Sequence, residues 1–327
     1  RRVDTVGITV YIADAATGEK LWEASHDDMD YSIPARIKPL DTSADGFIDR
    51  LYAVDMGGQV FRFDINNNNG SALSSSVTGG RVADLAGDTD VDARRFYYPP
   101  DVALIDSKEG VYHALVLSSG YRAHPLNETI HDRIYMIKDR NTGRLTSNDD
   151  YKYQPGIDGV GSLTEDNLYN ATINLAGGEG VSGTDETVKE AALASIGSAE
   201  GWYINLSDED NSDAWVGEKG LAEPLIIEGK AVISTYLPPE PPAAGSCGAN
   251  EGSGKVFYLE VLDGTAAYPS SVDARSERHK KLARAGIPPS PNVIITSDGE
   301  PTLCLGTECE SADFGMVIRK TYWYEVN

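Results

Sequence analysis

The stretch DTSADGFIDRLYAVDMGGQVFRFD, residues 41–64, indicates the kind of structure that much of the chain adopts. In its first nine residues, oxygen-bearing side chains recur at every second position, and a further carboxylate closes the run. Calcium in proteins takes six to eight hard oxygen ligands, and an EF-hand loop supplies them from its first, third and fifth side chains, its seventh carbonyl and a late carboxylate. This pattern predicts a calcium site formed by the side chains of Asp41, Ser43, Asp45 and Asp49 and the main-chain carbonyl of Phe47.

The residues around this loop predict strands rather than the two helices of an EF-hand. Gly46 stands at the sixth position, where a tight loop needs a positive φ, but Tyr52 replaces the Glu that an EF-hand has at its twelfth position. Residues 50–54 and 59–64 alternate and are rich in aromatic and β-branched side chains, and residues 55–58 (DMGG) are a hairpin signal between them. The loop therefore opens a β-hairpin. The alternative is an Asx-rich turn that binds no metal.

Short strand patterns with turns at Gly and Asp recur along the chain. The pattern G-x-x-V-Y-x-x-D-x-x-T-G-x-x-x-W near the N-terminus resembles the blade repeat of quinoprotein-like propellers, and looser copies lie at 49–64, 133–144 and 255–264. Radial repetition of such units is typical of β-propellers. We therefore expect an all-β fold, a modified β-propeller with quinoprotein-like blades that carries loops and short helices as insertions. Unrelated hairpins in a β-sandwich are the alternative.

Length and composition favour one large β domain. The chain has 327 residues with 33 Gly and 17 Tyr, and we expect residues 1–327 to form a single propeller-like domain that is a fragment of a longer protein. Residues 145–200 lack a steady period and are predicted to be an insertion with a helix at 184–196. A second helix is expected at 271–285, where basic residues crowd the C-terminal half. Residues 66–80, rich in Asn, Gly, Ser and Thr, predict an exposed loop.

The charge of the chain excludes several classes of partner. Its 51 acidic and 28 basic residues give a net charge of −23, which argues against nucleic-acid binding and disfavours adsorption to anionic lipid. No apolar run of about 18 residues is present, so no membrane span is expected. The acidic groups Asp88, Asp90 and Asp92, and Asp208, Glu209, Asp210 and Asp213, are weaker candidates for a second cation site, with a solvated loop as the alternative.

The three cysteines predict one short disulfide. Cys304 and Cys309 flank a four-residue loop that a disulfide closes, and Cys247 is then free or paired elsewhere. Pairing of Cys247 with either of the other two is the alternative. No histidine stands near the cysteines in a zinc-like spacing, which argues against a zinc site.

The 41–64 stretch resembles the signature of the PilY-type pilus biogenesis factors, the tip-associated, adhesin-like proteins of type IV pili. Fainter similarity extends over 99–139, 201–239 and 275–291. The resemblance implies a propeller-like C-terminal domain with one calcium loop, whose ligands would be Asp41, Ser43, Asp45, Phe47 and Asp49. Ser43 departs from the family, which usually has Asp or Asn there, and this substitution weakens the expected affinity for calcium.

The resemblance also implies a function and a location. We expect a non-enzymatic, calcium-binding, secreted domain that supports pilus assembly, control of extension and retraction, twitching motility and surface adhesion. The expected partners are pilins or minor pilins at the pilus tip and a host or surface receptor. The expected location is extracellular and pilus-associated, or periplasmic and outer-membrane in transit.

Two other functions are compatible with blade repeats. A quinoprotein dehydrogenase also combines such repeats with calcium, but it usually has repeated Trp docking motifs, and this chain has four Trp in all. A generic propeller that binds protein or carbohydrate is the other possibility, and a groove lined by aromatic residues favours it. No nucleophile-elbow, zinc-protease or phosphate-binding glycine motif occurs in the sequence.

Overall fold

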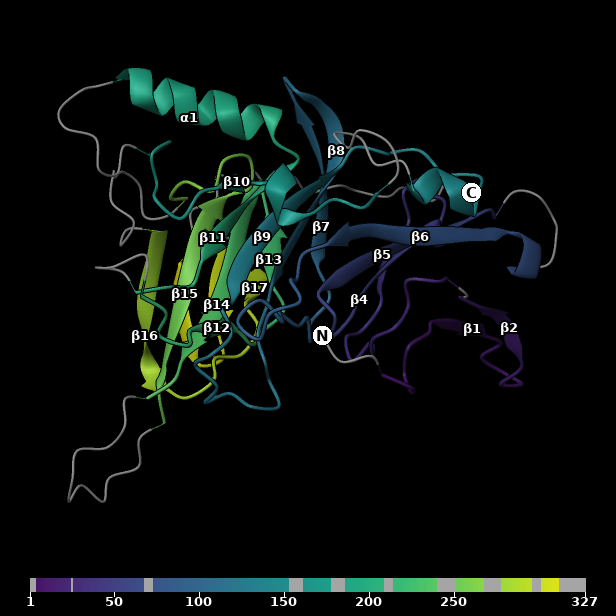
Figure 1. Ribbon diagram of the computed structural model, residues 1–327, viewed down its shortest axis with the longest axis horizontal. Coiled ribbons are helices and arrows are strands. Elements are labelled where there is room, and N and C mark those ends of the chain that lie inside the picture. Colours follow the sequence, from purple (N-terminus) through teal and green to yellow (C-terminus); the bar gives the residue numbers. More distant parts are fainter. Residues whose placement is uncertain are drawn as a thin grey trace, which may run out of the picture.

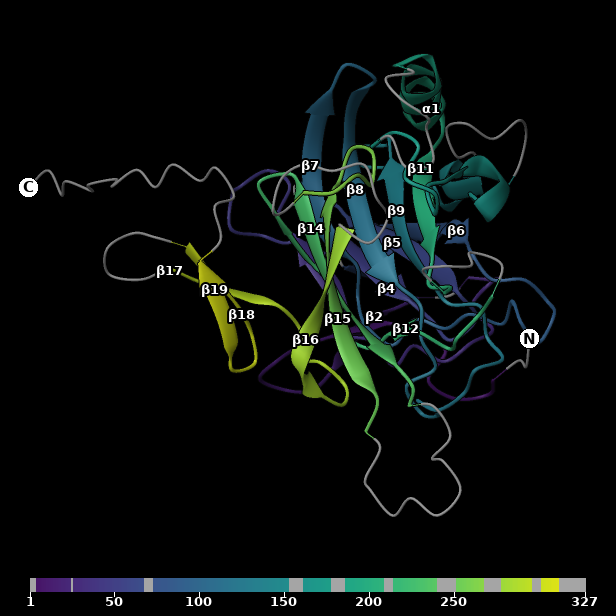
Figure 2. The same cartoon turned by 90° about the vertical axis from the view of Figure 1, so that its left-hand side faces the viewer.

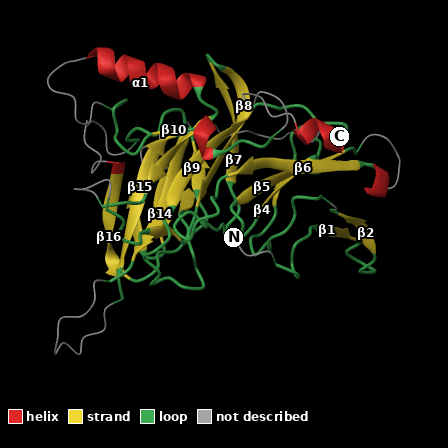
Figure 3. Cartoon of the chain, viewed as in Figure 1, coloured by secondary structure: helices red, strands yellow, loops and turns green. Residues whose placement is uncertain are grey.

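The computed structural model is all-β, and its described residues form one α-helix and short 3₁₀ turns beside the strands (Figure 1, Figure 3). It describes residues 4–24, 26–67, 73–152, 161–177, 186–208, 214–239, 251–267, 278–295 and 301–311. Cys247 and the acidic residues Glu209, Asp210 and Asp213 lie outside these ranges. Among the described helices, none is both long enough and apolar enough to cross a membrane.

The first large sheet contains the hairpin predicted from the 41–64 stretch. Its antiparallel order is β3 (Lys38–Leu40), β4 (Arg50–Val54), β5 (Gln59–Ile65) and β6 (Val77–Asp84). In the turn between β4 and β5, the N–H groups of Gly57 and Gln59 donate to the Asp55 carboxylate at 2.9 and 2.8 Å. Gly58 takes φ = 78°, a conformation that glycine adopts without strain.

Two further large sheets follow along the chain. The second has the order β10-β11-β9-β8-β7. Its strands are β7 (Asp101–Ser107), β8 (Gly110–Ser118), β9 (Arg133–Asp139), β10 (Tyr169–Asn170) and β11 (Gly201–Asn205). The third has the order β12-β14-β15-β16, with β13 paired to β14. Its strands are β12 (Lys219–Gly220), β13 (Leu225–Ile227), β14 (Lys230–Leu237), β15 (Ser253–Glu260) and β16 (His279–Ala285).

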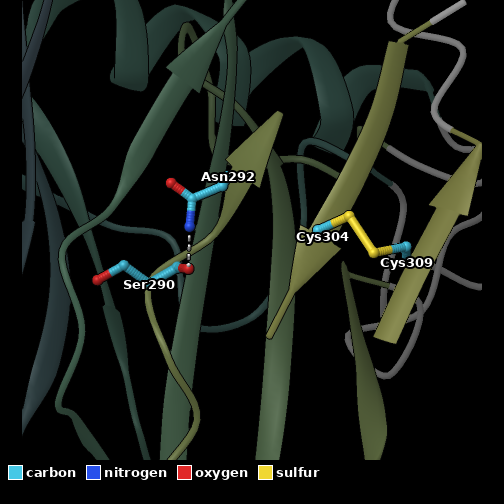
Figure 4. The surroundings of a disulfide bond; sticks show 4 residues. All are labelled: Ser290, Asn292, Cys304 and Cys309. Atoms are coloured by element: carbon cyan, nitrogen blue, oxygen red, sulfur yellow. Dashed lines mark hydrogen bonds between the residues drawn. A yellow bond between two sulfur atoms is a disulfide. The ribbon is translucent and has the colours of Figure 1, made fainter. Parts of the chain in front are cut away.

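Smaller sheets lie at the two ends of this series. Near the N-terminus, β1 (Tyr11–Ala13) pairs with β2 (Lys20–Glu23). Near the C-terminus, β17 (Asn292–Ile295), β18 (Pro301–Leu305) and β19 (Glu308–Ser311) form an antiparallel sheet beside the third large one (Figure 2). The β18–β19 hairpin contains a disulfide between Cys304 and Cys309 (Figure 4). In the same view, the Asn292 amide donates to the Ser290 carbonyl at 3.1 Å.

Successive sheets pack face to face. Strand β8 shows this, because its side chains alternate between two cores and are buried on both sides. Leu115 and Leu117 pack with the first sheet, whereas Ala114 and Val116 pack with β14, β15 and the helix. Two further apolar clusters join the N-terminal hairpin to the first sheet and β18 to the third. The all-β expectation is confirmed, but no sheet in the described part is closed, so the propeller stays a prediction.

The predicted insertion contributes to the core. Its expected helix is α1 (Glu186–Ser198), which buries Ala192 and Ile196 against the second sheet. From the same segment, β10 pairs in parallel with β11. The insertion therefore extends and covers the second sheet.

Two secondary-structure predictions are wrong where the structure describes them. Residues 279–285 form β16, because pairing with β15 overrides the helix propensity of this Lys- and Arg-rich run. Residues 77–80 belong to β6 instead of an exposed loop. Gly79 and Gly80 are buried there, and a Cβ atom would lie 2.1 Å from Phe63 and 2.5 Å from Tyr151. Gly79 and Gly80 therefore allow neighbouring side chains to pack closely against the β6 backbone.

A glycine in β11 provides a test of this arrangement. Gly201 has φ = 144°, and a Cβ atom there would lie 2.0 Å from the Met136 carbonyl oxygen in β9. We predict that Gly201→Ala lowers the free energy of unfolding by roughly 2–4 kcal/mol, through overpacking and backbone strain. Gly143→Ala is the control, because its added methyl group meets no atom within 4 Å. Urea denaturation of both variants measures the difference, and equal stability of the two contradicts the described β9–β11 pairing.

Candidate functional site: an acidic loop backed by a buried ion-pair cluster

The predicted calcium loop connects β3 to β4, and main-chain hydrogen bonds fix its end. The N–H of Asp49 donates to the Leu40 carbonyl at 2.9 Å, and the Asp49 carbonyl accepts from the N–H of Ile65 at 2.7 Å. Because both contacts continue the ladder of the first sheet, Asp49 is held between β3 and β5. The remaining loop residues are exposed.

The loop backbone folds around the carboxylate of Asp41. The N–H of Gly46 donates to Oδ2 of Asp41 at 2.8 Å, and the N–H of Asp45 approaches Oδ1 at 3.3 Å. Gly46 adopts φ = 91°, as its position in the pattern predicted. Ala44 also has a positive φ of 59°, which the sequence did not indicate because alanine seldom adopts it.

The closing carboxylate, Asp49, also accepts several hydrogen bonds. Its Oδ2 accepts from the N–H and hydroxyl of Thr42, at 2.8 and 2.9 Å, and from the N–H of Ser43 at 3.0 Å. Its Oδ1 accepts from the Asn67 amide at 3.1 Å. Burial alone would raise the pKa of Asp49, but the hydrogen bonds outweigh it and lower the pKa. Asp49 is therefore ionised at neutral pH.

Thr42 and Asn67 are contacts of the site that the sequence analysis missed. Thr42 occupies a position that supplies no ligand in a calcium loop. Asn67 belongs to a run of four asparagines after β5, in which the sequence alone does not distinguish one residue from the next. Its amide also donates to the Ile48 carbonyl at 2.9 Å, so it ties the end of β5 to the end of the loop.

The oxygen donors of the loop suit calcium by type, but they are not gathered around one point. No group of three or more His, Cys, Asp or Glu side chains in the described residues could hold a metal ion. Instead, each carboxylate is turned toward N–H groups of the loop, as Asp45 is toward Phe47 at 2.9 Å. An ionised carboxylate has about four acceptor positions, so these bonds leave lone pairs on Asp41, Asp45 and Asp49. The donor set therefore fits a hard cation once the side chains converge.

In the first of the two weaker candidates for a second cation site, Asp92 is bound by protein groups. Asp92 accepts from the Arg94 guanidinium at 3.0 Å and from the Thr89 hydroxyl at 2.6 Å. These bonds give Asp92 a structural role in the turn before Arg94. Of the other acidic group, only Asp208 lies within the described residues.

Directly behind the loop, a buried ion-pair cluster joins the first and second sheets. Arg62 on β5 is fully buried, and its guanidinium donates to Asp64 at 2.8 Å and to Asp139 on β9 at 3.0 Å. Arg50, the residue after Asp49, donates to Asp64 at 2.8 Å and contacts Nδ1 of His113 at 3.1 Å. Two guanidinium groups thus balance two carboxylates. We call Arg50, Arg62, Asp64 and Asp139 the inter-sheet cluster.

The remaining contacts of the inter-sheet cluster satisfy its polar groups. Both arginines donate to the Gly143 carbonyl, at 2.9 Å from Arg50 and 2.6 Å from Arg62. The hydroxyls of Tyr52 and Tyr151 donate to Asp139 and Asp64 at 2.5 and 2.6 Å. Complete hydrogen bonding of this kind is what makes buried charges tolerable in a protein interior.

The pKa values around the inter-sheet cluster follow from burial and charge. Burial would raise the pKa of Asp64, but the adjacent Arg62 and Arg50 outweigh it and lower the pKa. Burial raises the pKa of Tyr52 well above its usual value, and the nearby Asp139 adds to this effect. Burial and the Arg50 charge lower the pKa of His113 to about 4. His113 is therefore neutral at physiological pH.

Comparison with known proteins supports one of the expected families. No protein-family model matches the chain. Over 276 residues, it is 24% identical to a type IV pilus biogenesis factor PilY1 homolog of Xylella fastidiosa, an alignment that covers 79% of this chain and 17% of that protein. Its fold matches the crystal structure of the Pseudomonas aeruginosa PilY1 C-terminal domain with a TM-score of 0.60 and 18% identity, covering 94% of this chain and 67% of that one. The resemblance to the PilY-type C-terminal domain is confirmed.

This chain spans 17% of the length of the Xylella relative. The match to the Pseudomonas structure shows the fold of this chain.

Removing Arg62 tests the importance of the inter-sheet cluster. We predict that Arg62→Met lowers the free energy of unfolding by about 3–5 kcal/mol, because it leaves two buried carboxylates without their main counter-charge. Lys20→Met is the matched control, since it removes one partner of an exposed Lys20–Glu23 pair and is expected to leave stability unchanged. Chemical denaturation gives both values. An Arg62 variant as stable as the control contradicts a structural role for the cluster.

The pKa of His113 predicts a pH dependence of stability. In the folded chain the pKa of His113 is about 4, below the value of about 6.5 expected when unfolded, so between these values only the unfolded chain binds the proton. Stability therefore falls as the pH drops from about 6.5 to about 4, by an amount on the order of 1–3 kcal/mol. His113→Asn, which keeps an acceptor but does not titrate, is expected to remove this component.

The comparison of pH profiles must allow for a second buried group. Burial raises the pKa of Asp132 to about 6, so its contribution has the opposite sign as the pH falls toward 4. Because both proteins contain Asp132, the difference between their denaturation profiles isolates His113. Identical profiles contradict the prediction.

Proposed function

We propose that this chain is the C-terminal part of a type IV pilus biogenesis protein, and that it supports pilus assembly without being an enzyme. The observation that carries this proposal is the sequence similarity to a PilY1 homolog over 79% of the chain, together with the shared fold of a PilY1 C-terminal domain. The series of face-to-face sheets is compatible with a modified propeller. A pilus-associated, extracellular location and contact with pilins or minor pilins are part of the same proposal.

The second part of the proposal is that the loop 41–49 binds calcium. The ligands would be Asp41, Ser43, Asp45, the Phe47 carbonyl and Asp49. When bound, calcium supplies two positive charges to a loop that holds three carboxylates. The main chain already fixes Asp49 to the first sheet, and Gly46 already has the backbone angle that the loop requires. Control of pilus extension and retraction by calcium would act through this loop.

A surface cavity supports the proposed role in adhesion. It has a volume of about 590 Å³ and is lined by Tyr121, Ala123, His124, Pro125, Leu126 and Asn127. The rings of Tyr121 and His124 lie 4.6 Å apart, and the Arg95 guanidinium lies 4.0 Å above the Tyr121 ring. A cavity of this size with two aromatic rings in its wall is suited to a ligand or to a side chain of a receptor, and it is equally the feature expected of a propeller that binds protein or carbohydrate. The host or surface molecule would dock there.

Calorimetric titration tests the calcium site directly. After chelator treatment, the wild-type chain is expected to bind one calcium ion in a saturable manner, and Asp49→Ala is expected to weaken binding at least about tenfold, because it removes a charged ligand. Asp14→Ala is the control, since Asp14 also accepts two N–H bonds in an exposed turn but lies outside the loop. Wild type that binds no calcium at millimolar concentration contradicts the proposal.

Pilus counts test the biological role. In cells that express the full-length protein, deleting the region corresponding to this chain is expected to reduce the number of assembled surface pili and to impair twitching motility. Asp49→Ala in the full-length protein is expected to change the pilus number with protein level unchanged, whereas Asp14→Ala is not. Normal piliation after the deletion contradicts the proposed function.

A further inference from the structure

The C-terminal β17–β19 sheet is attached to the third large sheet through side chains. Strand β16 is the outer strand of the third sheet, and β19 faces it without main-chain pairing (Figure 2). The Glu308 carboxylate of β19 accepts the N–H groups of Ala283 and Arg284 of β16, at 3.0 and 2.9 Å. One side chain therefore binds two successive main-chain donors at a sheet edge.

A second glutamate of β19 makes a parallel attachment. Glu310 accepts from the Lys280 ammonium of β16 at 2.5 Å and from the Tyr258 hydroxyl of β15. Burial would raise the pKa of Glu310, but its hydrogen bonds from Lys280 and Tyr258 outweigh it and lower the pKa. The two glutamates, which we call the β19 clamp, point to the same side of β19 because they are two residues apart on a strand.

The disulfide lies between the two residues of the β19 clamp. Cys309 stands between Glu308 and Glu310, and its cross-strand partner is Cys304 on β18. Strand β18 is itself fixed by apolar packing of Leu303 and Leu305 against the third sheet. The disulfide therefore links the clamp to the part of the hairpin that the core holds in place (Figure 4).

The two sulfur atoms differ in their access to solvent. Cys304 is 5% exposed, whereas Cys309 is exposed and lines a cavity of about 310 Å³ between β15–β16 and β18–β19. The cavity wall contains Glu308 and Glu310 as well as Lys280, so its carboxylates outnumber its ammonium group. A thiolate reaches Cys309 from solvent, whereas Cys304 is shielded.

We propose that the Cys304–Cys309 disulfide is a thiol–disulfide exchange site, entered at Cys309, whose redox state controls the β19 clamp. The partner is a dithiol, either a small molecule or the active site of a thiol–disulfide oxidoreductase. Its thiolate attacks the Cys309 sulfur, the Cys304–Cys309 bond breaks, and Cys304 leaves as a thiolate that takes up a proton. The second thiol of the partner then releases Cys309 as a thiol, so that two electrons pass to the cysteine pair and the partner becomes a disulfide. The reverse reaction re-forms the Cys304–Cys309 disulfide and restores the β19 clamp.

The consequence of reduction is local. Without the disulfide, β19 stays joined to β18 by a two-residue turn and main-chain pairing but loses its cross-link at Cys309, and we expect Glu308 to separate more often from Ala283 and Arg284. The irregular end of β16, where its pairing with β15 shifts register, then exposes two main-chain N–H groups that another acceptor can bind. The apolar contacts of β18 do not depend on the disulfide, so the rest of the third sheet remains folded.

Amide hydrogen exchange of the full chain, measured by NMR, tests the proposal. Cys247→Ser is used as the background so that the third cysteine does not exchange. On reduction, confirmed by the appearance of two thiols per chain, the Ala283 and Arg284 amides are expected to exchange about tenfold faster, the change expected for losing a hydrogen bond to a charged group. Glu308→Ala is expected to produce the same change with the disulfide intact, and Glu19→Ala is not. The Met136 and Ile137 amides of β9 report on the global fold.

Two results would overturn the proposal. Unchanged protection of Ala283 and Arg284 after complete reduction shows that the disulfide does not control the clamp, and loss of protection in β9 as well shows a global rather than a local role. The entry point is tested separately by trapping the mixed disulfide with glutathione and mapping it by mass spectrometry. An adduct on Cys309 is expected, and an adduct on Cys304 contradicts entry at Cys309.

Discussion

The buried ion pairs of Arg62 are the constraint on which the two central sheets depend. Arg62 lies on the first sheet and binds Asp139 of the second, while Asp64 shares its charge between Arg62 and Arg50. Apolar packing between the same sheets is non-directional and tolerates small shifts. The fork of a guanidinium bound to two carboxylates fixes the relative position of β5 and β9 much more narrowly. The inter-sheet cluster therefore fixes the relative position of the two sheets, while the apolar core stabilises the interface between them.

Two adjacent residues, Asp49 and Arg50, connect the inter-sheet cluster to the acidic loop. Asp49 turns its carboxylate into the loop, and Arg50 turns its guanidinium into the inter-sheet cluster. Opposite them on β5, Asp64 belongs to the cluster and Ile65 binds the main chain of Asp49. The loop is thus attached to a part of the first sheet that the cluster holds in place, although its own residues are exposed. A rigid support of this kind would position ligands for the proposed calcium site, whose remaining residues would converge on binding.

The hairpin and the backbone of the loop could be predicted from the sequence, whereas the packing between sheets could not. Alternation in residues 50–64, a DMGG turn and Gly46 are local signals, and the structure places β4, β5 and the positive φ where they predicted them. The inter-sheet cluster was not predicted, because the partner of Arg62 lies 77 residues away and no local pattern specifies it. The signal in the sequence that could have indicated the cluster was the presence of charged residues within a buried strand. The helix expected at 271–285 is wrong over β16 because pairing across the sheet outweighs local propensity.

A crystal structure of the chain grown with calcium, with a chelator-treated crystal for comparison, tests the central claim most directly. Our interpretation predicts one ion in the loop 41–49, with Asp41, Ser43, Asp45, the Phe47 carbonyl and Asp49 at about 2.3–2.6 Å and the inter-sheet cluster unchanged. Density for the ion in another loop, or a loop that keeps its carboxylates on main-chain N–H groups at saturating calcium, would contradict it.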